Sequence, residues 1–205
     1  LATDSPALGG MYAGAIRLVG TEQGVGVKLA GNVAASASDL TIAADGKVSL
    51  AQASSTGNLA VSGQQVELTG KTYAGGSASV HSGAQVQIKQ SLAARERVDV
   101  RAGQLRNDGV IEAGVEADNS RNTRGDVSLT SQGLVNAGQV IASRDLEVTV
   151  SGAVDNRGGA LKGNQQRLSA DKLDNRAGQV LAEQDLQVTS RTLANRNAGG
   201  LHSKG

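Results

Sequence analysis

Few residues in this sequence form a recognisable catalytic or binding motif, and Arg124-Gly125-Asp126 is the most specific of them. The tripeptide is the motif that integrins recognise, so one hypothesis is that it contacts a host receptor. Asp126 also precedes an apolar residue, as Asp39 and Asp145 do. An aspartate side chain can hydrogen-bond nearby backbone, so these aspartates are expected to open strands. We favour this structural interpretation, because so short a motif often occurs by chance.

Three arginines, Arg157, Arg176 and Arg196, each follow an asparagine in a recurring phrase. If the phrases stack, the guanidinium groups form a basic stripe that could bind sulfated glycan or phosphate. Asp155 and Asp174 lie two positions before Arg157 and Arg176, and their carboxylates would partly neutralise such a stripe. The sequence therefore predicts a solvated charged face whose charges compensate one another.

Catalytic chemistry finds little support in the remaining residues. The two histidines, His81 and His202, lie far apart, and no group of His, Asp and Glu has the spacing of metal ligands. No candidate nucleophile has a base close to it in the sequence. We therefore predict that the segment is not an enzyme and carries no catalytic, metal or cofactor site.

One short phrase built on an asparagine recurs in the second half of the chain. Its asparagines are Asn107, Asn136, Asn156, Asn175 and Asn195, and the last four are spaced 20, 19 and 20 residues apart. A fixed period of this size indicates stacked supersecondary units. Asparagine tolerates the left-handed conformation and can bond to like residues above and below, so these five are predicted to form a structural turn ladder.

Short strands are indicated by apolar-x-apolar triplets, which occur in two alternating series. One series begins at Leu40, Leu59, Ala78 and Val98, and the other at Val48, Val66 and Val86. Strict alternation favours strands over helices. The sequence thus predicts an all-β parallel β-helix (β-solenoid) of about 19–20 residues per coil, with at least two strands in each coil and nine or ten coils. The longer step from Val98 to Val127 indicates a polar insertion at about residues 114–125.

Composition agrees with a narrow, repetitive core. Aromatic residues make up 1% of the 205 residues, with no Phe or Trp, and there are 28 Gly and one Pro. The absence of Cys excludes disulfides. A net charge of +1 gives no strong attraction to nucleic acid, and no apolar run is long enough for a membrane-spanning helix.

The opening segment carries a resemblance to a known family. Leu8 to Leu18 (LGGMYAGAIRL), with the following GTE and GVGV, resembles the end of the secretion domain in two-partner-secretion exoproteins. That family includes filamentous haemagglutinins and the contact-dependent growth-inhibition proteins of Gram-negative bacteria, and the later phrases are similar to its haemagglutinin repeats. The resemblance implies a right-handed β-helix in the shaft of a secreted cell-surface filament.

The resemblance also implies a domain organisation. Residues 1–30 are expected to end the secretion-domain region, residues 31–104 to form coils of low charge, and residues 105–205 to form Asn/Gly haemagglutinin-type repeats. The chain is expected to be an excerpt from a longer protein. The implied partners are an outer-membrane β-barrel transporter during secretion and a host receptor, glycan or neighbouring cell surface, and the segment is expected to be monomeric.

Two functions follow from these observations. The leading one is a structural shaft segment of an adhesin or toxin-delivery exoprotein, which presents distal elements and contacts surfaces. The alternative is a carbohydrate-active β-helix enzyme or a tailspike-like glycan-binding protein. Tyr12 and Tyr73 are too few for sugar-binding platforms, and the acidic residues are scattered singly, so we favour the shaft.

Overall fold

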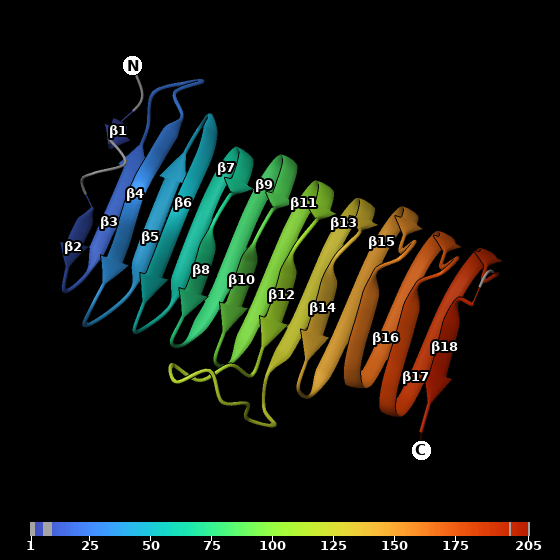
Figure 1. Cartoon of the computed structure of the whole chain (residues 1–205). Coiled ribbons are helices and arrows are strands. Elements are labelled where there is room, and N and C mark those ends of the chain that lie inside the picture. The colour runs from blue at the N-terminus through green and yellow to red at the C-terminus, as the bar shows by residue number, and fades with distance from the viewer. Residues whose placement is uncertain (1–2, 6–9, 197, 205) are drawn as a thin grey trace.

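The structure is a computed structural model that describes residues 3–5, 10–196 and 198–204. Within these ranges, 18 strands join in one sheet that winds into a β-solenoid (Figure 1). All pairings between the named strands are parallel, and successive partners such as Leu40 and Leu59 or Leu59 and Ala78 lie one coil apart. The all-β parallel solenoid with about 20 residues per coil that the sequence predicts is therefore confirmed. Leu8 and Gly9, on which part of the family resemblance depends, lie outside the described residues.

Each coil has three faces, where the triplets indicated at least two. The first face contains β3 (Ile16–Gly20), β5 (Leu40–Ala44), the first parts of β7 (Leu59–Leu68), β9 (Ser77–Ile88), β11 (Arg97–Asn107), β13 (Asp126–Asn136) and β15 (Asp145–Asp155), and the middle of β16 (Ala160–Asp174) and β17 (Gln179–Ala194). The second face contains β1 (Thr3–Ser5), the first parts of β4 (Val27–Ala35) and β6 (Lys47–Ser55), and the last parts of β7, β9, β11, β13, β15, β16 and β17.

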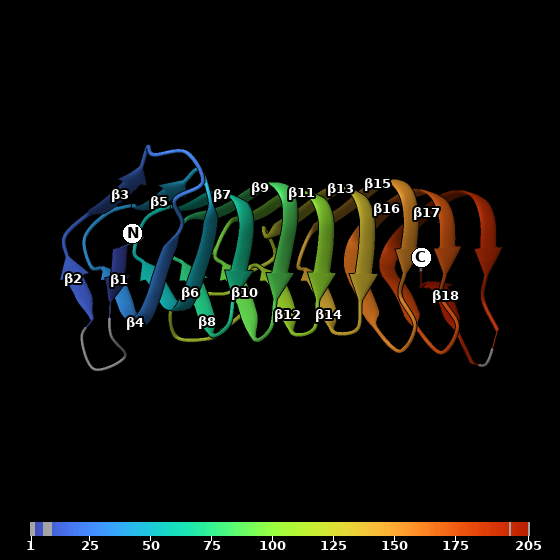
Figure 2. The ribbon, with the colours of Figure 1, turned by 90° about the horizontal axis from the view of Figure 1, so that it is seen from above.

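The third face is made mostly of short strands. It contains β2 (Met11–Ala13), the last parts of β4 and β6, then β8 (Lys71–Ala74), β10 (Ser91–Ala94), β12 (Val110–Ala113) and β14 (Gln139–Ala142), the first parts of β16 and β17, and β18 (Gly200–Ser203). Seen from above, the strands follow one another along a single axis (Figure 2). The result is a rod of about 10 turns.

The core is a set of aliphatic stacks along that axis. On the first face, Leu40, Leu59, Ala78, Val98, Val127 and Leu146 occupy the same inward position in successive coils and are all buried. Alternation along each strand sends these side chains inward and their neighbours outward. Burial of each Val or Leu contributes about 1.5–3 kcal/mol, and the stacking repeats that contribution in every coil.

The backbone of the ladder asparagines differs from the sequence expectation. Among the described residues, none of the five asparagines has a positive φ; Gly158, Ala177 and Ala198 adopt it instead, at φ values of 69, 55 and 60°. The expectation of left-handed asparagines was therefore wrong. The physical reason is that the backbone of Asn156 is still bonded to the next coil, since its N–H donates to the carbonyl of Asp174 at 2.8 Å. The chain turns only after the side chain has been placed inside.

Candidate functional site

The five asparagines form one stack at the corner that ends the second face. The side-chain Nδ2 of each of the first four donates to the Oδ1 of the asparagine in the next coil. The distances are 2.8 Å from Asn107 to Asn136, 2.7 Å from Asn136 to Asn156, 2.6 Å from Asn156 to Asn175 and 2.8 Å from Asn175 to Asn195. We call this set the asparagine stack.

A second hydrogen bond uses the remaining amide proton of each of the first four asparagines. The Nδ2 groups of the first four asparagines also donate to backbone carbonyls, at 3.0–3.1 Å, on Gln139, Ala160, Gln179 and Gly200. These four side chains are fully buried. A buried polar group is stabilising only when its partners are present, and here both donors and the acceptor have them. Such amides are engaged within the fold and are not presented to a ligand.

Glycine completes the turn after each of the later asparagines. A Cβ atom at Gly159, Gly178 or Gly199 would lie closer to a backbone carbonyl of the preceding coil than real Cβ atoms approach. The carbonyls belong to Asn136, Asn156 and Asn175. The asparagine and the glycine of the phrase therefore act together. The asparagine side chain bonds neighbouring coils to each other, and the glycine, which has no side chain, lets the coils approach closely.

Charged residues beside the asparagine stack are paired. Arg157 contacts Asp155 at 2.6 Å and Asp174 at 3.8 Å, and Arg176 contacts Asp174 at 2.6 Å. The hydrogen bond from Arg176 lowers the pKa of Asp174 to about 2, against the opposing effect of burial. The compensated face is thus confirmed for these four residues, and they do not form an open anion site.

The Arg124-Gly125-Asp126 tripeptide lies where the excursion of residues 114–125 rejoins the solenoid. Asp126 is the first residue of β13, and its carboxylate accepts two hydrogen bonds from Arg144, at 2.8 and 2.5 Å. Burial acts to raise the pKa of Asp126, but the hydrogen bonds from Arg144 outweigh it and the pKa falls below its ordinary value. Gly125 is buried and Arg124 is exposed. Receptor binding would require Asp126 to exchange an internal partner, so it stays a hypothesis for experiment.

The excursion of residues 114–125 is fastened to the coils beside it. The Tyr73 hydroxyl donates to the Val115 carbonyl at 3.1 Å, and Arg95 pairs with Glu116 at 2.9 Å. Between these anchors and the tripeptide, the side chains of residues 117–121 are exposed. In Figure 1 the excursion projects from the edge of the solenoid beside β12 and β14.

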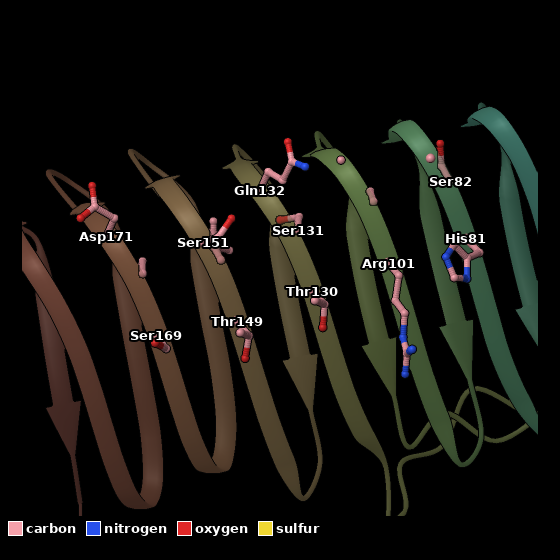
Figure 3. A pocket seen from close by; sticks show the side chains of 15 residues that line it. His81, Ser82, Arg101, Thr130, Ser131, Gln132, Thr149, Ser151, Ser169 and Asp171 are labelled. Carbon is pink, nitrogen blue, oxygen red and sulfur yellow. The ribbon is translucent and has the colours of Figure 1, made fainter.

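A shallow groove of about 650 Å³ runs along the corner between the first and second faces. Its outer row contains the exposed side chains of His81, Arg101, Thr130, Thr149 and Ser169, which occupy the same position in successive coils. Figure 3 shows this row across neighbouring strands. The groove was missed from the sequence, although hydroxyl residues one coil apart at Thr130, Thr149 and Ser169 could have indicated it.

The charged groups of the groove do not form a reacting pair. Asp171 lies at one end and is bound to Arg191, with Nε to Oδ1 at 2.7 Å. Arg101 lies near the other end and contacts Asp99 at 3.3 Å. No group of three or more His, Cys, Asp or Glu residues that could hold a metal ion occurs in the part of the chain that the structure describes. The groove can offer hydroxyl groups to a ligand along several coils.

None of the described residues belongs to a helix with the length and apolar character that crossing a membrane requires. The second histidine, His202, lies on β18 and is exposed, far along the chain from His81. The structure therefore does not bring the two histidines into one site.

Comparison with known proteins gives a consistent result. The family model for the haemagglutinin repeat matches residues 1–63, 54–158 and 163–205. A protein named tRNA nuclease CdiA from Yersinia mollaretii is 32% identical over 175 residues, which cover 83% of this chain and 6% of that protein. A 16S rRNA endonuclease CdiA from Enterobacter cloacae is 31% identical over 178 residues, or 84% of this chain and 5% of that protein. No solved structure matches.

A shorter stretch is more similar to a further relative. A tRNA nuclease CdiA from Escherichia coli (strain NC101) is 48% identical over 82 residues, which cover 40% of this chain and 2% of that protein. The chain thus spans a small fraction of the curated relatives that it matches. The likeness concerns the repeat region.

Proposed function

This chain belongs to the haemagglutinin-repeat family and is homologous to the CdiA exoproteins of contact-dependent growth inhibition, and from that premise we propose that it is a shaft segment. Its role is to hold a distal binding or toxic element away from the cell that makes it. The observation that carries the proposal is the uninterrupted parallel pairing from coil to coil along the whole described rod. Ten coils at about 4.8 Å each give a length of about 48 Å.

The proposal extends to export and location. The segment passes through an outer-membrane transporter, as the two-partner-secretion family does, and works at the surface of a Gram-negative bacterium. The relatives are named as nucleases of tRNA or 16S rRNA. We place any such activity of the parent protein outside this segment, because the charged groups described above are paired with one another rather than gathered at one site.

Deletion of whole coils tests the shaft role. Asp145 pairs with Gln165, so removal of residues 145–164 joins Arg144 to Gln165 and removes one coil in register. In an exoprotein that carries this segment, we expect this deletion to preserve export and activity on target cells and to shorten the rod by about 4.8 Å. A matched deletion of residues 145–154 removes half a coil and should abolish folding. A folded, exported whole-coil deletion that no longer acts on target cells would contradict the shaft role and assign a specific contact to that coil.

Glycan binding is a second candidate, and the hydroxyl-lined groove favours it. A chain of sugars could lie along the row from Arg101 to Ser169 and exchange hydrogen bonds with it. Incubation with pectin, alginate and host glycosaminoglycans separates the alternatives. Binding without products supports an adhesive shaft, whereas release of sugar products would establish an enzyme. Thr149→Val should weaken glycan binding in the groove, and Thr41→Val, outside the groove on β5, is the control.

Integrin contact has its own test. Asp126→Glu should abolish integrin-dependent cell attachment if Arg124-Gly125-Asp126 is a receptor motif. Asp145→Glu is the matched control, because Asp145 occupies the same position in the next coil without the motif. Equal attachment by the two variants and the parent would remove the motif from consideration.

A further inference from the structure

Gln166 interrupts an otherwise aliphatic stack in the core. It lies on β16, in register with Leu146 of the coil before and Leu186 of the coil after. Only 1% of its surface is exposed. Glutamine is thus placed where its partners in neighbouring coils are leucines.

The carboxamide of Gln166 has no hydrogen-bond partner among the described residues. Both its Nε2 and its Oε1 are buried and unsatisfied. The asparagine stack shows how this solenoid satisfies a buried amide, through an amide in the coil above and another below. Leucine side chains offer no hydrogen-bond donor or acceptor. The desolvation of the Gln166 amide is therefore not compensated and destabilises the fold.

Two further features of this coil recur elsewhere in the rod. Ala170 on β16 is in register with Val150 on β15, so the inward side chain is smaller than its predecessor. The pairing between β16 and β17 shifts register between Gly163 and Gln165. Register shifts are found in other coils as well, and Ser131 occupies the position of Ala170 two coils earlier. The feature that distinguishes this coil is the amide of Gln166, whose nitrogen and oxygen both lack partners.

We propose that the coil centred on β16 is a breakpoint at which the solenoid opens before any coil that precedes it. In a one-dimensional stack each coil contacts only its neighbours, so β17 and β18 are joined to the rest through this coil alone. Opening at β16 releases them together while the coils up to β15 stay wound. A filament under tension yields at this position. The inference goes beyond the shaft role and does not depend on it.

Hydrogen exchange on the 205-residue chain tests the breakpoint. We expect a step in amide protection between β15 and β16, with β16 and β17 exchanging faster than β15. Gln166→Leu removes the unsatisfied amide and restores the leucine stack, so exchange in β16 and β17 should slow by about 10- to 100-fold. Gln165→Leu, at the exposed neighbouring position, is the control and should change exchange less than about threefold.

A second variant distinguishes the breakpoint from simple fraying at the C-terminal end of the rod. The double variant Leu146→Gln with Gln166→Leu moves the unsatisfied amide one coil earlier, so the loss of protection should now include β15. The breakpoint is overturned if protection falls smoothly towards the C-terminus and Gln166→Leu leaves it unchanged. It is equally overturned if the double variant Leu146→Gln with Gln166→Leu leaves β15 protected as in the parent.

Discussion

The two halves of the rod fill the same inward position with different chemistry. In the coils before Asn107, the position at the end of the second face holds Leu29, Leu50, Leu68 and Ile88. Asn107 pairs directly with Ile88, and from there the asparagine stack continues. The backbone register does not change at this junction. The fold therefore accepts either an apolar stack or a hydrogen-bonded one, provided that neighbouring coils agree.

Both stacks require that neighbouring coils carry the same kind of side chain at this position. A leucine between leucines is stabilised by burial, and an asparagine between asparagines is stabilised by hydrogen bonds to both. Either residue placed in the other stack loses its own stabilisation and harms its neighbours. Gln166 is the natural example of such a mismatch, with an amide between two leucines.

The largest effect is expected from placing an asparagine deep in the apolar stack. Leu50→Asn would bury an amide between Leu29 and Leu68. The lost apolar contacts, together with the desolvation of an amide that has no hydrogen-bond partner, should destabilise the fold by about 3–5 kcal/mol. Ile88→Asn is the matched control: it adjoins Asn107, whose Oδ1 can accept a hydrogen bond, so its cost should be clearly smaller. Denaturant unfolding measures both. Equal costs would show that the identity of the neighbouring residue does not matter.

The reverse exchange should be nearly as damaging. Asn156→Leu leaves the Nδ2 of Asn136 and the Oδ1 of Asn175 without their partner, at a cost of about 2–4 kcal/mol. Arg157→Ala removes only an exposed ion pair and should cost less than about 1 kcal/mol. Thermal melting of the two variants provides the comparison. Similar melting temperatures would contradict the assigned role of the stack.

The sequence predicted the periodic parts of this architecture well and the aperiodic parts poorly. Two faces were found because Val, Leu and Ile alternate in them, whereas the third was not separated because triplets such as Thr72-Tyr73-Ala74 carry small or polar inward residues. The asparagine positions could be read from their spacing. The left-handed residues could not, since Ala177 adopts φ 55° only because the coils around it fix the turn.

The candidate sites show the same limit. The tripeptide at Arg124 to Asp126 is visible in the sequence, but its bond to Arg144 depends on which residues the winding brings together. The groove arises from single positions that recur one coil apart, and its concave shape depends on small residues such as Ala102 and Gly103 between the faces. Neither the partner of Asp126 nor the shape of the groove can be recognised from a short stretch of sequence.

A moderate effect is expected at the turn glycines that follow the asparagines. Gly178→Ala would force a methyl group against the Asn156 carbonyl and should destabilise the fold by about 2–3 kcal/mol. Gly158→Ala is the control: nothing lies within 4 Å of its Cβ position, and only its φ of 69° is unfavourable. It should cost about 1 kcal/mol. Chemical denaturation distinguishes steric contact from backbone strain, and the opposite order would contradict the close approach of the coils.

The smallest effect is expected from acid. Because the pKa of Asp174 is about 2 in the fold and about 3.9 when unfolded, its pair with Arg176 contributes fully above about pH 4. That contribution is lost as the pH falls towards 2. Asp174→Asn should therefore flatten this part of the stability profile and lower the melting temperature at pH 7 by less than about 3 °C. An unchanged acid profile in the variant would show that Asp174 does not contribute.

Disulfide formation between adjacent coils can show whether the chain winds once in about 20 residues with like positions stacked. The natural chain has no cysteine, so there is no background reaction. Thr130 and Thr149 are register partners on neighbouring strands, whereas Ile141 lies on the third face. We expect rapid disulfide formation between Thr130→Cys and Thr149→Cys, because register partners on adjacent strands lie about 4.8 Å apart, and none between Thr130→Cys and Ile141→Cys. Equal bridging of both pairs, or bridging only of the second, would contradict the solenoid.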